Sequence, residues 1–149
     1  MALREDVSER AHARVGFVLR QKWRLDAVIG IGGMASVYAA THRNGSRVAI
    51  KMLHPEVAID QEVTSRFLRE GYVANAVGHP GTVRVLDDDV AEDGAPFLVM
   101  ELLEGETLDS SLAHGKLMSL REAIVVADQV LDVLAAAHAK DIVHRDIKP

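Results

Sequence analysis

The sequence contains no cysteine among its 149 residues. It therefore forms no disulfide and has no thiolate for metal or redox chemistry, as is typical of proteins from a reducing compartment. Aromatic residues make up only 4% of the chain, whereas hydrophobic residues as a whole make up 48%. A chain of this length and hydrophobic content is expected to bury one ordinary core rather than to remain disordered.

An excess of positive charge is missing as well. The net charge of −5 at pH 7 argues against a nucleic-acid-binding surface as the main function. The first residues lack the apolar stretch of a secretory signal, and the most apolar segment, 123–139, is too often interrupted by polar residues to span a membrane. The histidines are scattered without ligand spacing, so we expect no metal ligands. These absences predict a cytoplasmic protein with neither nucleic acid nor membrane as partner.

The pattern along the chain predicts three parts. Residues 1–22 are rich in arginine and weakly patterned, so we expect an N-terminal extension. From Trp23 onward apolar and polar residues alternate, and Asn44-Gly45 predicts a tight two-residue turn with positive φ at both positions. The expected elements of this middle part are strands over 23–30, 36–42 and a run ending at 53, a helix over 60–79, and strands over 82–90 and 96–103.

Helices are expected in the last part of the chain. A short one is predicted over 107–115, and a longer one follows Ser119, where Glu122 three residues later completes a capping-box signature. The longer helix is apolar on nearly every side, which predicts burial on nearly every side. Where no other part of the protein covers this helix, we expect self-association or fraying.

A glycine-rich loop lies in "IGIGGMASV", residues 29–37. Gly30 and Gly32 occupy the first two positions of a G-x-G-x-x-G frame, and Ala35 occupies the third. Glycines allow backbone N–H groups to approach an anion closely, although a flexible hairpin turn without a ligand has the same composition. Strand-forming residues follow the loop, which disfavours the strand-to-helix loop of a dinucleotide fold and favours a flap over a triphosphate.

Charged residues at three places could serve such a flap. Lys51 ends the strand-like run "VAIK", and its ammonium group could contact phosphate oxygens. Glu70, on the predicted helix, could hold that lysine in place; alternatively it lies on a solvated helix face, paired with Arg66. In the terminal "HRDIKP", Asp146 could act as a general base and Lys148 could neutralise a transferring phosphoryl group, unless the segment is simply a charged loop.

Taken in order, "IGIGGMASV", "VAIK", the helix glutamate, "HPGTVRVLD", "PFLVMELLEGETL" and "HRDIKP" resemble the eukaryotic-like serine/threonine protein kinases of bacterial type. The resemblance covers residues 23–149. It implies an α+β fold in which a twisted antiparallel sheet plus one helix forms a small lobe with its hinge over 23–105. The first helices of an incomplete helical large lobe are then expected over 106–149.

The resemblance also implies residue roles, with ATP as the cofactor. Met100 stands at the family's gatekeeper position, and the hinge begins at Glu101. The catalytic residues would be Lys51, Glu70, Asp146 and Lys148. The nucleotide-binding residues would be Ile29, Gly30, Ile31, Gly32, Gly33, Ala35, Val37, Ala49, Lys51, Met100, Glu101 and Leu103.

Two departures from the family pattern limit what the resemblance implies. Ala35 replaces the third glycine of the loop, which stiffens it slightly. More importantly, the family holds Mg²⁺ through an asparagine and a D-F-G aspartate that these 149 residues do not contain. We therefore expect serine and threonine residues of proteins as substrates of the family, but no useful phosphoryl transfer by these residues alone. The alternative is a non-catalytic module that binds nucleotide or docks on a kinase partner.

Acidic residues dominate one further stretch. Residues 86–115 contain no lysine or arginine but many aspartates and glutamates. Most of them are expected to form a solvated surface, and those near the hinge, Glu104 and Glu106, could favour basic peptides.

Overall fold

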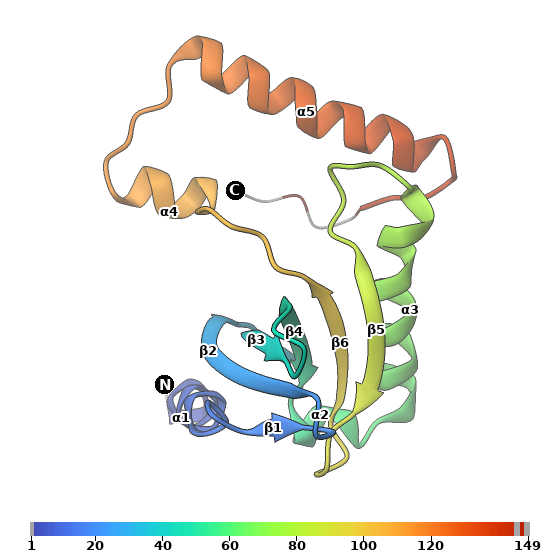
Figure 1. Cartoon of the computed structure of the whole chain (residues 1–149). Helices are drawn as coiled ribbons and strands as arrows, with labels where there is room; N and C mark the ends of the chain where they lie inside the picture. The colour runs from blue at the N-terminus through green and yellow to red at the C-terminus, as the bar shows by residue number, and fades with distance from the viewer. Residues whose placement is uncertain (1, 145–146, 148–149) are drawn as a thin grey trace. The chain divides into compact units, whose positions relative to one another are not determined.

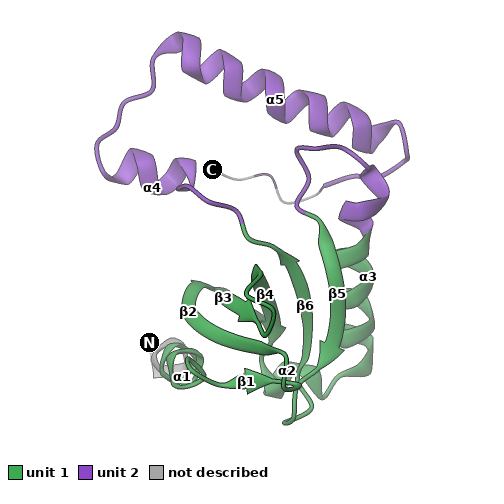
Figure 2. Ribbon diagram, viewed as in Figure 1, with its two compact units in different colours: residues 1–72, 84–102 green, residues 73–83, 103–149 purple. Residues whose placement is uncertain are grey.

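The structure is a computed structural model that describes residues 2–144 and residue 147. The chain forms two compact units (Figure 2). Unit 1 comprises residues 1–72 and 84–102, and unit 2 comprises residues 73–83 and 103–149.

Unit 1 is built on an antiparallel sheet with the strand order β1-β2-β3-β4-β6-β5 (Figure 1). Its strands are β1 (Val18–Leu19), β2 (Trp23–Ile31), β3 (Ala35–His42), β4 (Arg47–Leu53), β5 (Val85–Val90) and β6 (Pro96–Glu101). The helices α1 (Ala2–Ala13), α2 (Pro55–Ala58) and α3 (Gln61–Val77) precede or interrupt the strands, and unit 2 contains α4 (Leu108–Ala113) and α5 (Leu120–His138). The expected α+β fold is confirmed.

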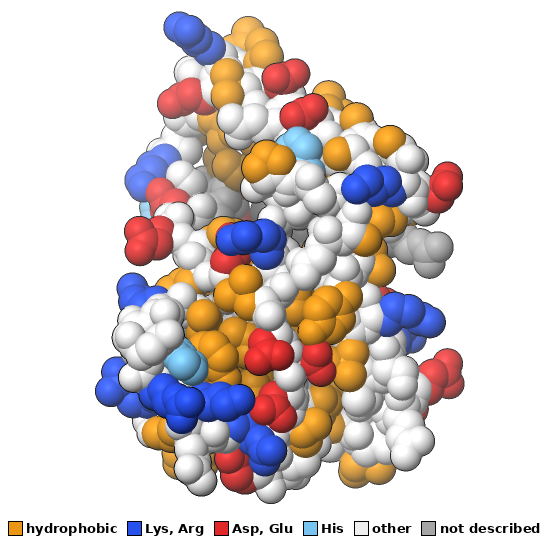
Figure 3. Space-filling model, turned by 45° about the vertical axis from the view of Figure 1, so that its right-hand side comes forward, with side chains coloured by type: hydrophobic (Ala, Val, Ile, Leu, Met, Phe, Trp, Pro, Cys, Tyr) orange, Lys and Arg blue, Asp and Glu red, His pale blue; other side chains and the backbone are white. Residues whose placement is uncertain are grey.

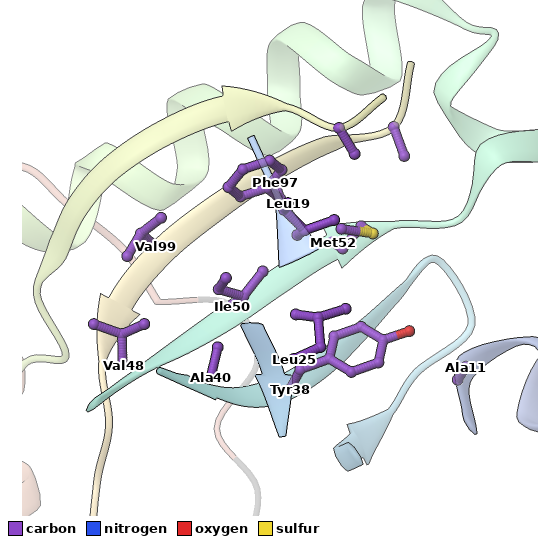
Figure 4. Packing of buried hydrophobic residues seen from close by; sticks show 12 residues of the cluster. Ala11, Leu19, Leu25, Tyr38, Ala40, Val48, Ile50, Met52, Phe97 and Val99 are labelled. Atoms are coloured by element: carbon purple, nitrogen blue, oxygen red, sulfur yellow. The ribbon is translucent and has the colours of Figure 1, made fainter. Parts of the chain in front are cut away.

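The larger core of unit 1 lies on one face of the curled sheet. Alternation along β3 places Tyr38 and Ala40 on this face, with 2% and 0% of their surface exposed. Figure 4 shows how side chains from several strands gather into one cluster. Its buried members are Ala11, Leu19, Leu25, Tyr38, Ala40, Val48, Ile50, Met52, Ala91, Ala95, Phe97 and Val99.

The N-terminal residues belong to this core, which differs from the extension that the sequence predicts. Ala11 of α1 and Leu19 of β1 are each 3% exposed and lie in the same cluster as the strands. Arg10 donates to Glu56 of α2 at 2.8 Å, and Arg14 forms an ion pair with Asp93. The sequence of α1 shows no periodic apolar face that would predict this packing, because Ala11 is its one buried residue among those whose side chains are described.

The acidic hairpin between β5 and β6 contacts Arg20, which directly follows β1, although β1 and β5 are at opposite ends of the strand order. The backbone N–H of Arg20 donates to Glu92 at 2.7 Å, and its guanidinium lies 3.5 Å from Asp89. Basic and acidic side chains accordingly lie next to one another in the lower half of Figure 3. Part of the acidic stretch therefore binds the N-terminal segment of the same chain.

The hairpin loop between β3 and β4 differs from the predicted two-residue turn. Gly45 has φ 90°, but Asn44 is not among the residues with positive φ. The loop has three residues, 43–45, closed by a hydrogen bond of 2.8 Å from His42 N–H to the carbonyl of Ser46. Gly94, with φ 86°, ends the loop between β5 and β6 in the same way. A three-residue loop that ends in a left-handed glycine preserves the strand twist, so only the glycine needs positive φ.

The turn between β1 and β2 has left-handed residues that are not glycine. Arg20 has φ 50° and Gln21 has φ 56°, which is unfavourable for side chains with a Cβ atom. Replacing Gln21 by glycine is therefore expected to raise the free energy of unfolding by about 0.5–1 kcal/mol, measured by urea denaturation. Gln21→Ala is the matched control, because it removes the same side chain but keeps Cβ, and an equal gain from it would contradict the explanation.

Unit 2 contains α4, α5, the last residues of α3 and the segment that follows α3. The predicted capping box is present: the Ser119 N–H donates to Glu122 at 2.8 Å, and the Glu122 N–H donates to the Ser119 hydroxyl. At the other end of α5, Lys140 donates to the carbonyl of Ala76 at 2.9 Å, and His79 lies 3.0 Å from Asp132. These contacts hold residues 73–83 against the helix.

Much of the apolar surface of α5 is exposed in the part of the chain that the structure describes, as the sequence predicts for a helix that no other part of the protein covers. Ala137 is the one buried residue among those of α5. Several large apolar side chains are exposed: Leu120, Ile124, Val125, Val130 and Leu131. None of the helices among the described residues is long and apolar enough to cross a membrane.

Candidate functional site

The register of the sheet brings the glycine-rich loop and Lys51 together. Val37 of β3 is paired with Gly30 of β2 on one side and with Lys51 of β4 on the other. Lys51 is in turn paired with Leu98 of β6. Directly paired residues of an antiparallel sheet share a face, so all four lie on the face opposite the larger core.

The same face continues as an apolar surface next to Lys51. Ala49, two residues earlier on β4, is paired with Ala39 of β3 and with Met100 of β6. Ala49 is 5% exposed and Met100 is partly buried. Small side chains flanked by a partly buried methionine leave a shallow apolar surface, which suits a flat ring better than a charged group.

Ile29, Ile31, Glu101 and Leu103, which are also predicted to bind nucleotide, do not belong to this row of paired residues. Ile29 and Ile31 of β2 are 53% and 42% exposed. Glu101, the last residue of β6, accepts a hydrogen bond of 2.8 Å from the Arg84 N–H within unit 1. Leu103 is 66% exposed and belongs to unit 2.

The glycine-rich loop is a tight hairpin that leads from β2 into β3. The Gly32 N–H donates to the carbonyl of Ala35 at 2.8 Å, so Gly33 and Met34 form a two-residue tip. The loop therefore does not open a helix, and the predicted order of strand, loop and strand is confirmed. The dinucleotide fold is excluded, because its phosphate-binding loop must begin a helix.

Gly33 is not required by the conformation of the loop. Its φ is not positive, and a Cβ atom built on it would meet no atom within 4 Å. Bare backbone at an exposed hairpin tip is what an anion needs in order to approach N–H groups. Ala35, which replaces the third glycine, has a structural role instead, because its methyl group is buried with Leu53 and Phe67.

Lys51 contacts α3 through Phe67 rather than through Glu70. Its Nζ lies 5.7 Å from the centre of the Phe67 ring. The nearest cation to Glu70 is Arg66, at 4.0 Å, and the Glu70 side chain is 70% exposed. Among the ion pairs of the described residues, the predicted pair between Lys51 and Glu70 is absent, and the alternative pairing with Arg66 is present. An exposed pair contributes at most about 1 kcal/mol, so the neighbour one helical turn away competes easily.

Helix α3 is nevertheless held close to the sheet beside Glu70. A Cβ atom at Gly71 would lie 2.4 Å from the Leu98 side chain, so the helix approaches β6 closely at this residue. The Tyr72 hydroxyl donates to Asp88 at 2.5 Å, and this hydrogen bond raises the pKa of Tyr72 to about 12. Because Phe67 lies one turn before Glu70, Lys51 already faces the part of the helix that carries the carboxylate.

The terminal residues of the predicted site lie outside the described part of the chain. Asp146 and Lys148 are both among them. Within the part that the structure describes, no three histidine, aspartate or glutamate residues are grouped as metal ligands.

Sequence reasoning missed two buried polar residues next to the loop. The Ser36 hydroxyl lies 3.0 Å from Nε2 of His54. The only signal in the sequence is the position of each, directly after the loop and directly after β4.

Comparison with known proteins identifies the family. The model of the protein kinase domain matches residues 23–149, which include the whole sheet except β1. The chain belongs to the protein kinase family. This kinase chain is 40% identical over 141 residues to the serine/threonine-protein kinase PknA of Mycobacterium tuberculosis, and 35% identical over 136 residues to the serine/threonine-protein kinase pkn3 of Myxococcus xanthus. Each match covers 91% of this chain, but only 33% of PknA and 25% of pkn3.

Solved structures agree with this assignment. The kinase domain of Mycobacterium tuberculosis PknI superimposes with a TM-score of 0.72 at 26% identity. The match covers 91% of this chain and 54% of the PknI chain. The kinase chain therefore spans little more than half of a solved kinase domain, and its two units correspond to the small lobe and to the beginning of the large lobe.

Proposed function

We propose that this chain is the ATP-binding part of a serine/threonine protein kinase that phosphorylates proteins. The observation that carries the proposal is the register of β2, β3 and β4, which places Gly30, Val37 and Lys51 side by side on one face. ATP fits these residues: the open backbone at Gly33 suits its phosphates, and the surface around Ala49 suits adenine. The kinase family supports ATP as the phosphoryl donor.

Each group has a distinct task in this proposal. The loop tip offers backbone N–H groups to phosphate oxygens, and Lys51 adds a positive charge that neutralises them. Bound phosphates draw the lysine away from Phe67, and Glu70 then exchanges Arg66 for Lys51. This exchange costs little because an exposed i,i+4 pair on a helix contributes only about 0.3–0.5 kcal/mol. Asp146 would receive the proton of the substrate hydroxyl.

The activity of these 149 residues by themselves is a separate proposal. Because they correspond to little more than half of a solved kinase domain, we propose that they bind ATP weakly and transfer no phosphoryl group at a useful rate. Incubation of the purified chain with radiolabelled ATP, Mg²⁺ and a protein substrate tests this. Robust Mg²⁺-dependent labelling would contradict it.

A valine at position 33 tests the assignment of the loop. Gly33→Val is expected to weaken binding of a fluorescent ATP analogue by about tenfold, because its side chain blocks the approach of phosphates to one or two N–H groups. The thermal midpoint should remain within about 2 °C of the unaltered chain, since a Cβ atom at this tip meets no other atom within 4 Å. Arg43→Val, at the tip between β3 and β4, is the matched control and should leave the affinity unchanged. Equal affinities of both variants would contradict the proposal.

A second candidate is a non-catalytic module that docks on another kinase. The exposed position of Glu70 and the partial exposure of Tyr72, at 41%, favour α3 as the docking surface. This candidate predicts that the isolated chain forms a complex with a complete kinase and that Glu70→Lys abolishes the complex. Size-exclusion chromatography of the mixture provides the measurement.

A further inference from the structure

A buried pair of polar side chains lies directly behind the glycine-rich loop. Ser36 and His54 are the polar members of the buried residues whose side chains are described, with 2% and 8% of their surface exposed. The Ser36 hydroxyl and Nε2 of His54 are 3.0 Å apart. Ser36 is the second residue of β3, and His54 follows the last residue of β4, so the pair joins the two strands at their loop end.

His54 also contacts the tip of the loop. Its backbone N–H donates to the carbonyl of Met34 at 2.9 Å, and its ring is hydrogen-bonded to Ser36, two positions after Met34. Gly33 and Met34 are the two tip residues of the hairpin closed between Gly32 and Ala35. One buried residue, three positions after Lys51, therefore contacts the tip through its backbone and the start of β3 through its ring.

The position of His54 in the chain extends this connection to the helices. It is the N-cap residue of α2, which precedes α3, and it lines a pocket of about 200 Å³ beneath α1. The other titratable residues lining this pocket are Arg10 of α1, Arg14 directly after α1, Tyr38 of β3 and Glu56 of α2. The imidazole thus lies where α1, the sheet and the loop meet.

We propose that the neutral imidazole of His54 is a positioning residue for nucleotide binding, which holds the Gly33–Met34 tip in the orientation that binds phosphates. The inference rests on the proposed ATP-binding function and adds a residue to it. His54 acts through the backbone of the loop and does not touch the nucleotide. Protonation makes both ring nitrogens donors, so the Ser36 hydroxyl loses the acceptor for its own proton, and the link between the ring and the start of β3 weakens.

The surroundings of His54 favour the neutral form. Burial lowers the pKa of His54 below its ordinary value of 6.5, and the positive charges of Arg10 and Arg14 lower it further. The Glu56 carboxylate and the Gly33 backbone act in the opposite direction but do not cancel this shift. A histidine whose folded pKa lies below its unfolded value stabilises the fold above the unfolded pKa, and this stability is lost as the pH falls below about 6.5. The loop is therefore expected to loosen in the acidic direction.

Binding of a fluorescent ATP analogue between pH 5.5 and 8.0 tests the proposal with the full 149-residue chain. His54→Leu is expected to weaken binding at pH 7.5 by about fivefold, the effect of one lost hydrogen bond, and His54→Gln is expected to restore most of the affinity. The ratio of the affinity of the unaltered chain to that of His54→Gln should fall toward acidic pH. Protonation of the nucleotide and of the other histidines affects both chains alike, so it cancels in this ratio. His114→Leu, at an exposed histidine of unit 2, should behave like the unaltered chain.

Two results would overturn the inference in different ways. If the unaltered chain binds the analogue and His54→Leu binds it equally well over the whole pH range, His54 does not position the loop, although the proposed function stands. If the unaltered chain does not bind the analogue at any pH, the proposed function fails and the inference fails with it. Ser36→Ala provides a second variant from the other side of the pair and should reproduce the loss at pH 7.5 should His54→Leu fail to fold.

Discussion

Replacing Lys51 by methionine is expected to weaken ATP binding by about 10- to 100-fold. Gly30, Val37, Lys51 and Leu98 form one row of paired residues, and Lys51 carries the positive charge of this row. A hydrogen bond to a charged group contributes about 1.5–3 kcal/mol, which corresponds to this range of affinity. Methionine keeps the length of the side chain and removes the charge.

The stability of the Lys51→Met variant should hardly change. Lys51 is exposed, and its contact with Phe67 in the absence of nucleotide contributes only about 0.5–1 kcal/mol. Arg47→Met is the matched control, because Arg47 is an exposed cation on the same strand, four residues away. Isothermal titration calorimetry with ATP measures all three chains. The site would be wrong if the Lys51 and Arg47 variants bound equally tightly.

Replacing Ala11 by aspartate is expected to lower the free energy of unfolding by about 3 kcal/mol. Ala11 is 3% exposed, in the cluster that contains Tyr38 and Met52, and an aspartate there places a carboxylate among apolar side chains. The loss cannot exceed the free energy that holds α1 on the sheet, because the helix can detach. Amide exchange should then show α1 unprotected while β3 and β4 remain protected.

Ala13→Asp separates the effect of burial from that of helix chemistry. Ala13 is exposed near the end of the same helix, so its replacement should lower stability by less than about 1 kcal/mol. Equal effects of the two substitutions would show that α1 does not depend on its packing against the sheet. A large difference would show that residues 1–22 are part of the small lobe.

The outcome for α1 and α5 illustrates how far sequence patterns reach. The pattern of α5 is strongly periodic, and its start at Ser119 and capping box are correct. Its apolar surface is largely exposed, because burial depends on what packs against the helix and not on the helix itself. Helix α1 shows the limit of such patterns: a polar sequence with Ala11 as its one described buried residue still completes the core.

Electrostatic partners were the least predictable feature. The acids of the β5–β6 hairpin bind Arg14 and Arg20, which lie more than 60 residues earlier in the chain. Of the acids near the hinge, Glu106 pairs with Lys116. The hypothesis that Glu104 and Glu106 select basic peptides therefore remains a prediction. Exposed ion pairs are weak, so local proximity decides among several candidates, and a sequence does not show proximity.

Local patterns in the sequence determined the elements from Trp23 onward, the glycine-rich loop and the family, because alternation, glycine positions and motif order are properties of neighbouring residues. Tertiary structure alone decided three things: that α1 completes the core, that Glu70 pairs with Arg66, and that His54 lies behind the loop tip. The first and the third depend on surfaces that meet only after folding and that come from residues distant in the chain. The second decides between a neighbour four residues away and a lysine on the sheet.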